Sequence, residues 1–190
     1  MSEKYNIVLA SNSPRRKELL RGLGIPFEVR IIHDIDESFP EYMPPAEIPC
    51  YIARKKADAY FLTIKENELI ITADTVVILD GRVIAKPVDR DDAIRMLHLL
   101  SGRTHEVITS VVMTSLEKQV EFAVHSMVDF AVLEHEEIMH YVDTFQPYDK
   151  AGAYGIQEWI GYIGVKGIQG SFYNVMGLPV QRLYWELKKF

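Results

Sequence analysis

An apolar run followed by a polar turn and a basic amphipathic stretch, residues 7–20, most constrains the fold of this chain. Ile7-Val8-Leu9 is typical of a buried strand, and the stretch from Pro14 has the spacing of a helix that ends near Gly22. Ser13 is a good N-cap, and Pro14 suits the first helical position because its ring already fixes a helical φ. Residues 7–20 therefore predict a strand, a polar loop and a helix in succession.

The start of this helix has an unusual charge pattern. Arg15 and Arg16 stand in the first turn, where the helix dipole favours acidic side chains over basic ones. The hydroxyls of Ser11 and Ser13 and the free N–H groups of the first turn are expected beside these cations. We expect this corner to bind an anion such as phosphate, although an ordinary helix start with a solvated basic face would use the same residues.

Composition limits the class of protein. The 190 residues suffice for one domain, or for one sheet with two lobes, and 48% are hydrophobic and 25% charged, as in ordinary globular proteins. The net charge of -6 argues against bulk nucleic-acid binding. Cys50 is the only cysteine, which excludes an intrachain disulfide and suits a reducing compartment. No apolar run is long enough to span a bilayer, so we expect a cytoplasmic protein without membrane association.

The remaining chain alternates predicted strands and helices. Asp80-Gly81 is a strong two-residue hairpin turn between the apolar run 69–79 and the returning segment 82–85. Further strands are predicted at 27–32, 106–115 and 120–132, and further helices at about 43–63, 89–100, 134–142 and after Pro179. Because hairpins alternate with helical crossovers, we expect an α/β fold with a mixed sheet flanked by helices.

One acidic residue interrupts an apolar strand. Asp74 has apolar neighbours on both sides within 69–79, and a buried carboxylate is costly unless it is paired, ligates a metal or opens onto a cleft. An aspartate bonded to a backbone turn is the alternative interpretation. Asp36 and Glu37 follow a predicted strand and could add a second acidic ligand for a divalent cation, or simply form an exposed acidic loop.

Lysines stand near the ends of predicted elements. Lys86 follows the segment 82–85, and Lys55 and Lys56 belong to one helix, although each could equally be a solvated surface lysine. Together with the anion-binding helix start and Asp74, they describe a site for a polyphosphate and a divalent metal. Mg²⁺ is usually held by one or two carboxylates and the substrate phosphates. The sequence has no glycine-rich Walker-type loop, so we do not expect a P-loop NTPase.

A set of short stretches is spread over nearly the whole chain. They are Ser11-Asn12-Ser13-Pro14-Arg15-Arg16, Glu37, Ala53-Arg54-Lys55-Lys56-Ala57, Ala73-Asp74-Thr75, Lys86-Pro87, Leu100-Ser101-Gly102-Arg103-Thr104-His105, residues 149–157 and Asn174-Val175-Met176-Gly177-Leu178-Pro179. In order and spacing this set resembles the Maf family of nucleoside triphosphate pyrophosphatases. The resemblance implies a single Maf-like domain over residues 1–190, with a bent mixed β-sheet flanked by helices, two lobes and a central cleft, similar to inosine triphosphate pyrophosphatases.

The resemblance also implies a reaction and a set of site residues. The reaction is hydrolysis between the α- and β-phosphates to a nucleoside monophosphate and pyrophosphate, with Mg or Mn as the divalent metal. By similarity, Asp74 is the general base that activates water, with Lys56 and Lys86 as further catalytic residues. Glu37 and Asp74 hold the metal. The implied substrate-binding residues are Ser11, Ser13, Arg15, Arg16, Thr75 and Gln157.

Substrate preference follows from the branch of the family. One branch prefers dTTP and UTP and another prefers 7-methyl-GTP, and Arg15, Thr75 and Gln157 match the first. We therefore expect an enzyme that hydrolyses dTTP and UTP, and the resemblance to the family also implies a homodimer. The alternatives are the same reaction mainly on modified nucleotides, or a nucleotide-binding regulator of cell division. Segment 158–169 departs from the family's usual pattern because it is longer, and it places the bulky Glu158 and Trp159 directly after Gln157.

Overall fold

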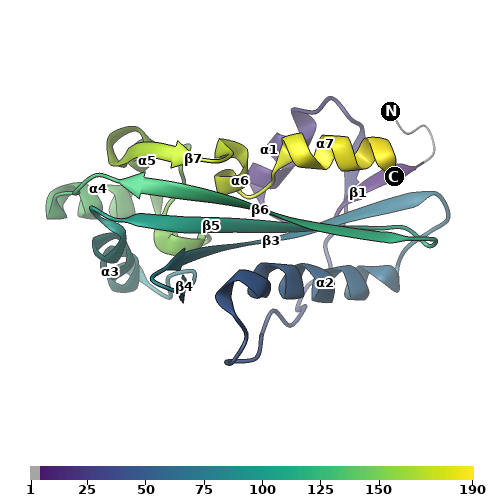
Figure 1. The fold of residues 1–190 in the computed structure, drawn as a ribbon, viewed down its shortest axis with the longest axis horizontal. Helices are drawn as coiled ribbons and strands as arrows, with labels where there is room; N and C mark the ends of the chain where they lie inside the picture. Colours follow the sequence, from purple (N-terminus) through teal and green to yellow (C-terminus); the bar gives the residue numbers. More distant parts are fainter. Residues whose placement is uncertain (1–4) are drawn as a thin grey trace. The chain divides into compact units, whose positions relative to one another are not determined.

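The computed structural model describes residues 5–190, which form two compact units. The first unit comprises residues 5–74, 109–124 and 177–190, and the second comprises 75–108 and 125–176. Within residues 5–190 the strands form one seven-stranded sheet in the order β2-β1-β3-β5-β6-β7, with β4 paired to β3 (Figure 1). The predicted mixed sheet with flanking helices is confirmed, and the two units agree with the two lobes that the sequence predicts.

The bounds of the elements follow the predicted order closely. The strands are β1 (Asn6–Leu9), β2 (Phe27–Val29), β3 (Glu68–Leu79), β4 (Arg82–Ile84), β5 (Thr104–Thr114), β6 (Gln119–Phe130) and β7 (Val165–Gln169). The helices are α1 (Pro14–Arg21), α2 (Ile48–Phe61), α3 (Arg90–Leu100), α4 (His135–Phe145), α5 (Trp159–Gly164), α6 (Phe172–Met176) and α7 (Val180–Lys189), with 3-10 turns η1 (Pro45–Glu47) and η2 (Ala151–Ala153). β1 runs parallel to β2 and β3, whereas β3 and β4, and β6 and β7, are antiparallel.

Two predicted elements are shorter than expected. The helix predicted from about residue 43 begins at Ile48. Pro44 precedes Pro45 and has a ψ of 131°, outside the helical region, and the chain from Pro45 to Glu47 forms only a 3-10 turn. The strand predicted to reach residue 32 ends at Val29. Beyond it, the Ile32 N–H donates to the Tyr60 hydroxyl at 2.8 Å instead of to a neighbouring strand. Tyr60 thus directs the chain away from the sheet.

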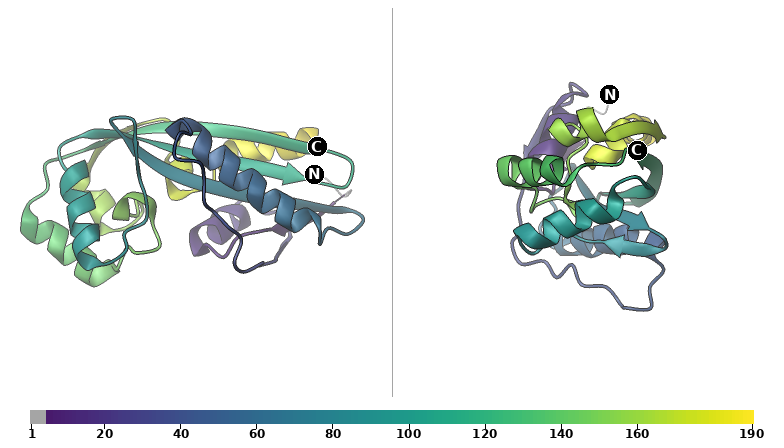
Figure 2. Two further views of the ribbon diagram at one scale, coloured as in Figure 1. Left: turned by 90° about the horizontal axis from the view of Figure 1, so that it is seen from below. Right: turned by 90° about the vertical axis from the view of Figure 1, so that its left-hand side faces the viewer.

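Small residues let α2 approach the sheet in the first unit. Ala53 and Ala57 are fully buried and cluster with Val112 of β5. Thr72 of β3 donates its hydroxyl to the Ala53 carbonyl at 2.8 Å. α2 lies on one face of the strands and α7 on the other (Figures 1 and 2). This close packing brings the α2 side chains within reach of β3.

The second unit contains the predicted hairpin and the packed helices α3 and α4. Asp80 and Gly81 both have positive φ, 49° and 71°, as a tight two-residue hairpin turn requires. Asp89 caps α3 as predicted, accepting from the Asp92 N–H at 2.8 Å. α3 and α4 lie side by side (Figure 2). The glycine-rich segment up to Gly170, where no regular element was predicted, contains α5 and β7.

Gly161 in α5 occupies a position that leaves no room for a side chain. A Cβ atom there would lie 1.8 Å from the carbonyl oxygen of Ile156, so the backbone would have to move. We expect Gly161→Ala to lower the free energy of unfolding by about 1–3 kcal/mol, as overpacking does. Urea denaturation measures this loss. Gly167→Ala is the matched control, because nothing lies within 4 Å of a Cβ there, and equal stability of the two variants would contradict the prediction.

Candidate active site

The loop before α1 is held together by its own serines. The Ser13 N–H donates to the Ser11 hydroxyl at 3.2 Å, and the Arg16 N–H donates to the Ser13 hydroxyl at 3.4 Å. Ser13 has extended φ and ψ, so the predicted N-cap is confirmed. Each hydroxyl accepts from the backbone and still has its own proton to donate to a ligand.

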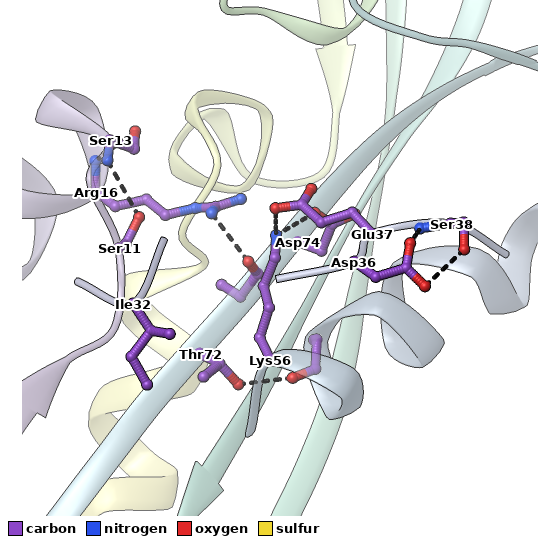
Figure 3. A network of polar contacts seen from close by, with 12 residues as sticks. Ser11, Ser13, Arg16, Ile32, Asp36, Glu37, Ser38, Lys56, Thr72 and Asp74 are labelled. Carbon is purple, nitrogen blue, oxygen red and sulfur yellow. Dashed lines mark hydrogen bonds and ion pairs between the residues drawn. The ribbon is translucent and has the colours of Figure 1, made fainter. Parts of the chain in front are cut away.

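Arg16 braces three segments of the first unit. Its Nε donates to the Gly177 carbonyl at 2.8 Å. Its Nη1 donates to the Ala73 carbonyl at 2.9 Å, a bond drawn in Figure 3. Burial lowers the pKa of Arg16, and the nearby Asp74 charge opposes that shift. A guanidinium stays charged in proteins. Arg16 therefore places a positive charge beside Asp74 while fixing the peptide that precedes it.

A carboxylate, an ammonium group and a second carboxylate converge next to this brace. Lys56 Nζ lies 2.9 Å from Asp74 Oδ1 and 3.1 Å from Glu37 Oε1 (Figure 3). The side chains of Lys56 and Asp74 are each 12% exposed, whereas that of Glu37 is 47% exposed. Asp74 comes from β3, Lys56 from α2 and Glu37 from the loop after β2. Three segments that are distant in sequence thus form one charged cluster.

The environment of Asp74 favours its protonated form. Burial raises the pKa of Asp74, and the charges of Lys56 and Arg16 only partly oppose this shift, while Glu37 adds to it. A carboxylate whose pKa is raised accepts a proton more readily than an exposed one. The interpretation that Asp74 merely bonds to a backbone turn does not describe it, because its partner is the ammonium group of Lys56.

Asp36 and Lys55 form a second acid–lysine pair between the loop after β2 and α2. This pair stabilises the conformation of the loop and does not contact Asp74. Asp36 accepts from the Ser38 N–H at 2.9 Å and from the Ser38 hydroxyl at 2.8 Å. Lys55 Nζ lies 2.7 Å from Asp36 Oδ2. The hydrogen bonds from Lys55 and Ser38 hold the pKa of Asp36 well below its usual range. This pair ties the loop to α2 and leaves Glu37 and Lys56 to face Asp74.

The other predicted site residues belong to the second unit. Thr75 is half-buried in β3, and Lys86 is exposed just after β4. The Gly152 N–H donates to the Ala85 carbonyl at 3.0 Å, so the segment that leads to Gln157 is joined to the residue before Lys86. Gln157 is half-buried, and its side-chain oxygen is buried without a hydrogen-bond partner among residues 5–190.

A set of buried polar residues on and around the segment that carries Gln157 had no role predicted from the sequence. Lys150 is buried and lies 3.2 Å from Glu158 Oε1, and Tyr141 of α4 bonds to Glu158 as well. His105 and Tyr154 form another buried pair, with His105 Nε2 2.7 Å from the Tyr154 hydroxyl. Three of these residues stood in the stretches used for the resemblance, which was the available signal. Glu158 and Tyr141 lie outside them: Glu158 stood out only as a departure from the family's pattern, and Tyr141 had no signal.

Residues 5–190 contain no group of three or more histidine, cysteine, aspartate or glutamate side chains that could hold a metal ion. None of the helices described is both long enough and apolar enough to cross a membrane.

Comparison with known proteins places the chain in a family. The family model described as Maf-like protein matches residues 6–190, which is nearly the complete chain. The chain belongs to the Maf family. The resemblance noted from the short sequence stretches is therefore confirmed, and the matched range contains all the predicted site residues.

Several curated Maf relatives share one name, dTTP/UTP pyrophosphatase. That of Bacteroides thetaiotaomicron is 60% identical over 187 residues, which are 98% of this chain and 97% of that protein. That of Parabacteroides distasonis is 61% identical, over 99% of this chain and 97% of that protein. A more distant relative from Flavobacterium psychrophilum is 46% identical, over 96% of this chain and 93% of that protein.

Solved structures with low sequence identity also align with this Maf protein. A nucleoside-triphosphatase / dITP/XTP pyrophosphatase from Mycobacterium abscessus is 17% identical with a TM-score of 0.44, over 96% of this chain and 94% of that chain. A HAM1 protein from Coxiella burnetii is 16% identical with a TM-score of 0.45, over 98% of this chain and 100% of that chain. The family assignment rests on the family model and the sequence relatives, and not on these structures.

Proposed function

We propose that this chain hydrolyses dTTP and UTP to the nucleoside monophosphate and pyrophosphate. The observation that carries the proposal is the identity of 60–61% over nearly the full length with curated proteins named dTTP/UTP pyrophosphatase. In this reaction a water oxygen bonds to the α-phosphorus, and the bond from the α-phosphorus to the bridging oxygen breaks. Pyrophosphate leaves with that oxygen, and the water proton must be taken up by a base.

Asp74 is the residue we propose as that base. Its carboxylate is buried, and burial raises its pKa, which makes it a better proton acceptor than an exposed aspartate. Lys56 holds Asp74 Oδ1 at 2.9 Å and so fixes the orientation of the carboxylate. The second oxygen of Asp74 would face the attacking water.

The cluster also fits a divalent cation. Asp74 and Glu37 both approach Lys56 Nζ, so two carboxylates of different segments lie close together. This set suits Mg or Mn, which takes one or two carboxylates and completes its coordination with substrate phosphates. When bound, the metal would neutralise phosphate charge and lower the pKa of bound water. We propose Asp74 and Glu37 as its ligands.

The triphosphate needs further positive charge and hydrogen-bond donors. Lys56 and Arg16 supply charge beside Asp74, although two Arg16 donors already bond to backbone carbonyls. Lys86 is exposed and is proposed as a further phosphate contact. The remaining proposed phosphate and substrate contacts are Ser11, Ser13, Arg15 and Thr75.

Gln157 is proposed to bind the nucleobase. Its buried side-chain oxygen has no partner in residues 5–190 and can accept from the N3–H of uracil or thymine, while the amide nitrogen donates to a base carbonyl. Leaving a buried acceptor unpaired is costly, so a base that supplies a donor is favoured.

We expect Gln157→Ala to lower kcat/KM for UTP much more than kcat/KM for CTP, so that the selectivity for UTP over CTP falls. Cytosine presents an acceptor at N3 and a donor at C4, the reverse of uracil, so only the fixed amide distinguishes the two bases. The ratio of kcat/KM values for UTP and CTP measures the effect. Equal losses on both nucleotides would mean that Gln157 does not contact the base.

Product analysis tests the reaction itself. The protein is incubated with Mg²⁺ and dTTP, UTP, CTP, GTP or ITP, and the products are separated by ion-exchange chromatography. Monophosphate and pyrophosphate from dTTP and UTP are the expected products. Diphosphate and phosphate, or no turnover of any nucleotide, would overturn the proposal. The homodimer and the cytoplasmic location stay predictions.

A further inference from the structure

One hydroxyl group contacts the residues on both sides of Gln157. The Gly155 N–H donates to the Tyr141 hydroxyl at 2.9 Å, and the same hydroxyl donates to Oε2 of Glu158. Tyr141 is fully buried in α4, far from this segment in sequence. Burial, together with the bond to Glu158, raises the pKa of Tyr141, so the phenol keeps the proton that it donates.

The backbone between these two contacts closes into a turn. The Glu158 N–H donates to the Gly155 carbonyl at 2.9 Å, which is the bond of a four-residue turn with Gln157 in its third position. Tyr141 therefore binds the first and last residues of the turn that presents Gln157. Movement of the Gln157 backbone would break at least one of these bonds.

The Glu158 carboxylate is fixed from several sides. Its Oε1 lies 3.2 Å from Lys150 Nζ, which is almost fully buried and also lies 2.7 Å from Asp149 Oδ1. A Cβ atom on Gly155 would lie only 2.7 Å from the carboxylate carbon, so the carboxylate packs directly on the Gly155 backbone. Although Glu158 is the N-cap residue of α5, its side chain does not cap that helix.

Trp159, the residue after Glu158, also contacts α4. The Trp159 ring meets the His140 ring edge-on, with 4.9 Å between centroids. Glu158 and Trp159 are the bulky residues that begin segment 158–169, and both direct their side chains to α4.

We infer that Tyr141, Glu158 and Lys150 are positioning residues that set the base selectivity of Gln157. The inference rests on the proposed function, since it requires Gln157 to bind the nucleobase. The three side chains hold the 155–158 turn in one conformation, so the Gln157 amide presents a fixed donor and acceptor. A fixed amide can match the edge of uracil and reject the reversed edge of cytosine. If the turn is free to move, the amide can adapt to either base.

The test compares hydrolysis of UTP and CTP by matched variants. Tyr141→Phe removes both contacts to the turn, and Glu158→Gln keeps an acceptor for Tyr141 but removes the charge that faces Lys150. We expect Tyr141→Phe to reduce the UTP to CTP selectivity by roughly three- to tenfold, because only part of the free energy of the two lost hydrogen bonds acts on base discrimination. The loss should come mainly from a higher KM for UTP. Glu158→Gln should lose selectivity in the same direction but less.

Tyr60→Phe is the matched control in the first unit. Tyr60 also bonds through its hydroxyl to two backbone groups, donating to the Arg30 carbonyl at 3.0 Å and accepting from the Ile32 N–H at 2.8 Å. Loss of this hydroxyl in Tyr60→Phe should lower thermal stability and leave the UTP to CTP selectivity at the wild-type value. If the UTP to CTP selectivity of Tyr60→Phe falls as far as that of Tyr141→Phe, general destabilisation explains both losses and the inference is overturned.

The outcomes separate this inference from the proposed function. If the wild type hydrolyses UTP with selectivity and Gln157→Ala loses it, but Tyr141→Phe and Glu158→Gln both retain it, the positioning role is wrong and the function stands. If the wild type does not hydrolyse UTP, the proposed function itself is wrong. Circular dichroism of each variant before the assay identifies any that fails to fold, and Glu158→Gln then decides the question.

Discussion

Asp74→Asn is expected to reduce turnover of dTTP by roughly 10²–10⁴-fold, the contribution typical of one general base. Asparagine has the same shape and retains an oxygen that can accept from Lys56 Nζ, which lies 2.9 Å from Asp74 Oδ1. The fold and the melting temperature should therefore change little. Steady-state release of pyrophosphate measures the rate, and circular dichroism measures the fold. Near-normal turnover in this variant would exclude Asp74 as the base.

The pH dependence of the rate gives an independent test of the same residue. Because burial raises the pKa of Asp74, the fraction of deprotonated base should rise with pH over a range above that of an ordinary aspartate. The rate of the wild type should rise over that range, and the residual rate of Asp74→Asn should not follow it.

Asp36→Asn is the matched control for Asp74→Asn. It removes a carboxylate that lies one residue from Glu37 and binds Lys55 and Ser38, not the cluster around Asp74. Its turnover should stay within a few-fold of the wild type. A loss as large as that of Asp74→Asn would assign the effect to the loop and not to the proposed base.

Local chemistry made much of the fold predictable. The Ser13 N-cap, the Asp80-Gly81 hairpin and the Asp89 N-cap each depend on residues within a few positions, and each forms as predicted. The charged cluster of Glu37, Lys56 and Asp74 was partly predictable because of its place in the sequence. A carboxylate inside an apolar run needs a partner, and the structure supplies Lys56.

Without the family resemblance, the residue pattern alone could not distinguish adjacent residues of the same type. Lys55 and Lys56 differ by about 100° around α2, so only one can face β3, and the phase is set by how Ala53 and Ala57 pack on the sheet. In the same way Arg16 reaches two backbone carbonyls that come from distant segments. These choices depend on tertiary contacts that have no local pattern.

Short elements and distant partners explain the rest. α5 and β7 are only six and five residues long and contain glycines, so neither shows a clear period. Tyr141 and Glu158 are separated by seventeen positions, and their contact forms only when α4 packs beside the 155–158 turn. The network around Gln157 is therefore visible only in the structure.

The contacts of His105 also join residues that are distant in sequence, and they were not predicted. It is 1% exposed in β5, and its ring meets those of Phe130 and Tyr154 edge-on, with centroids 5.0 and 5.4 Å away. Its Nδ1 is buried without a hydrogen-bond partner among residues 5–190. A protonated ring would have an N–H group with no acceptor in apolar surroundings, and burial lowers the pKa of His105 to about 4.

We expect the protein to lose stability as the pH falls from 6.5 towards about 4, because the unfolded chain binds a proton at His105 that the folded chain does not. The full shift corresponds to about 3 kcal/mol of unfolding free energy, and above pH 6.5 this group contributes no pH dependence. Urea unfolding at about pH 7.5 and about pH 5 measures the loss. His105→Gln should lose less than the wild type on acidification, whereas Tyr154→Phe, which keeps His105 buried, should remain acid-sensitive. The same loss in the wild type and His105→Gln would exclude His105 as the cause.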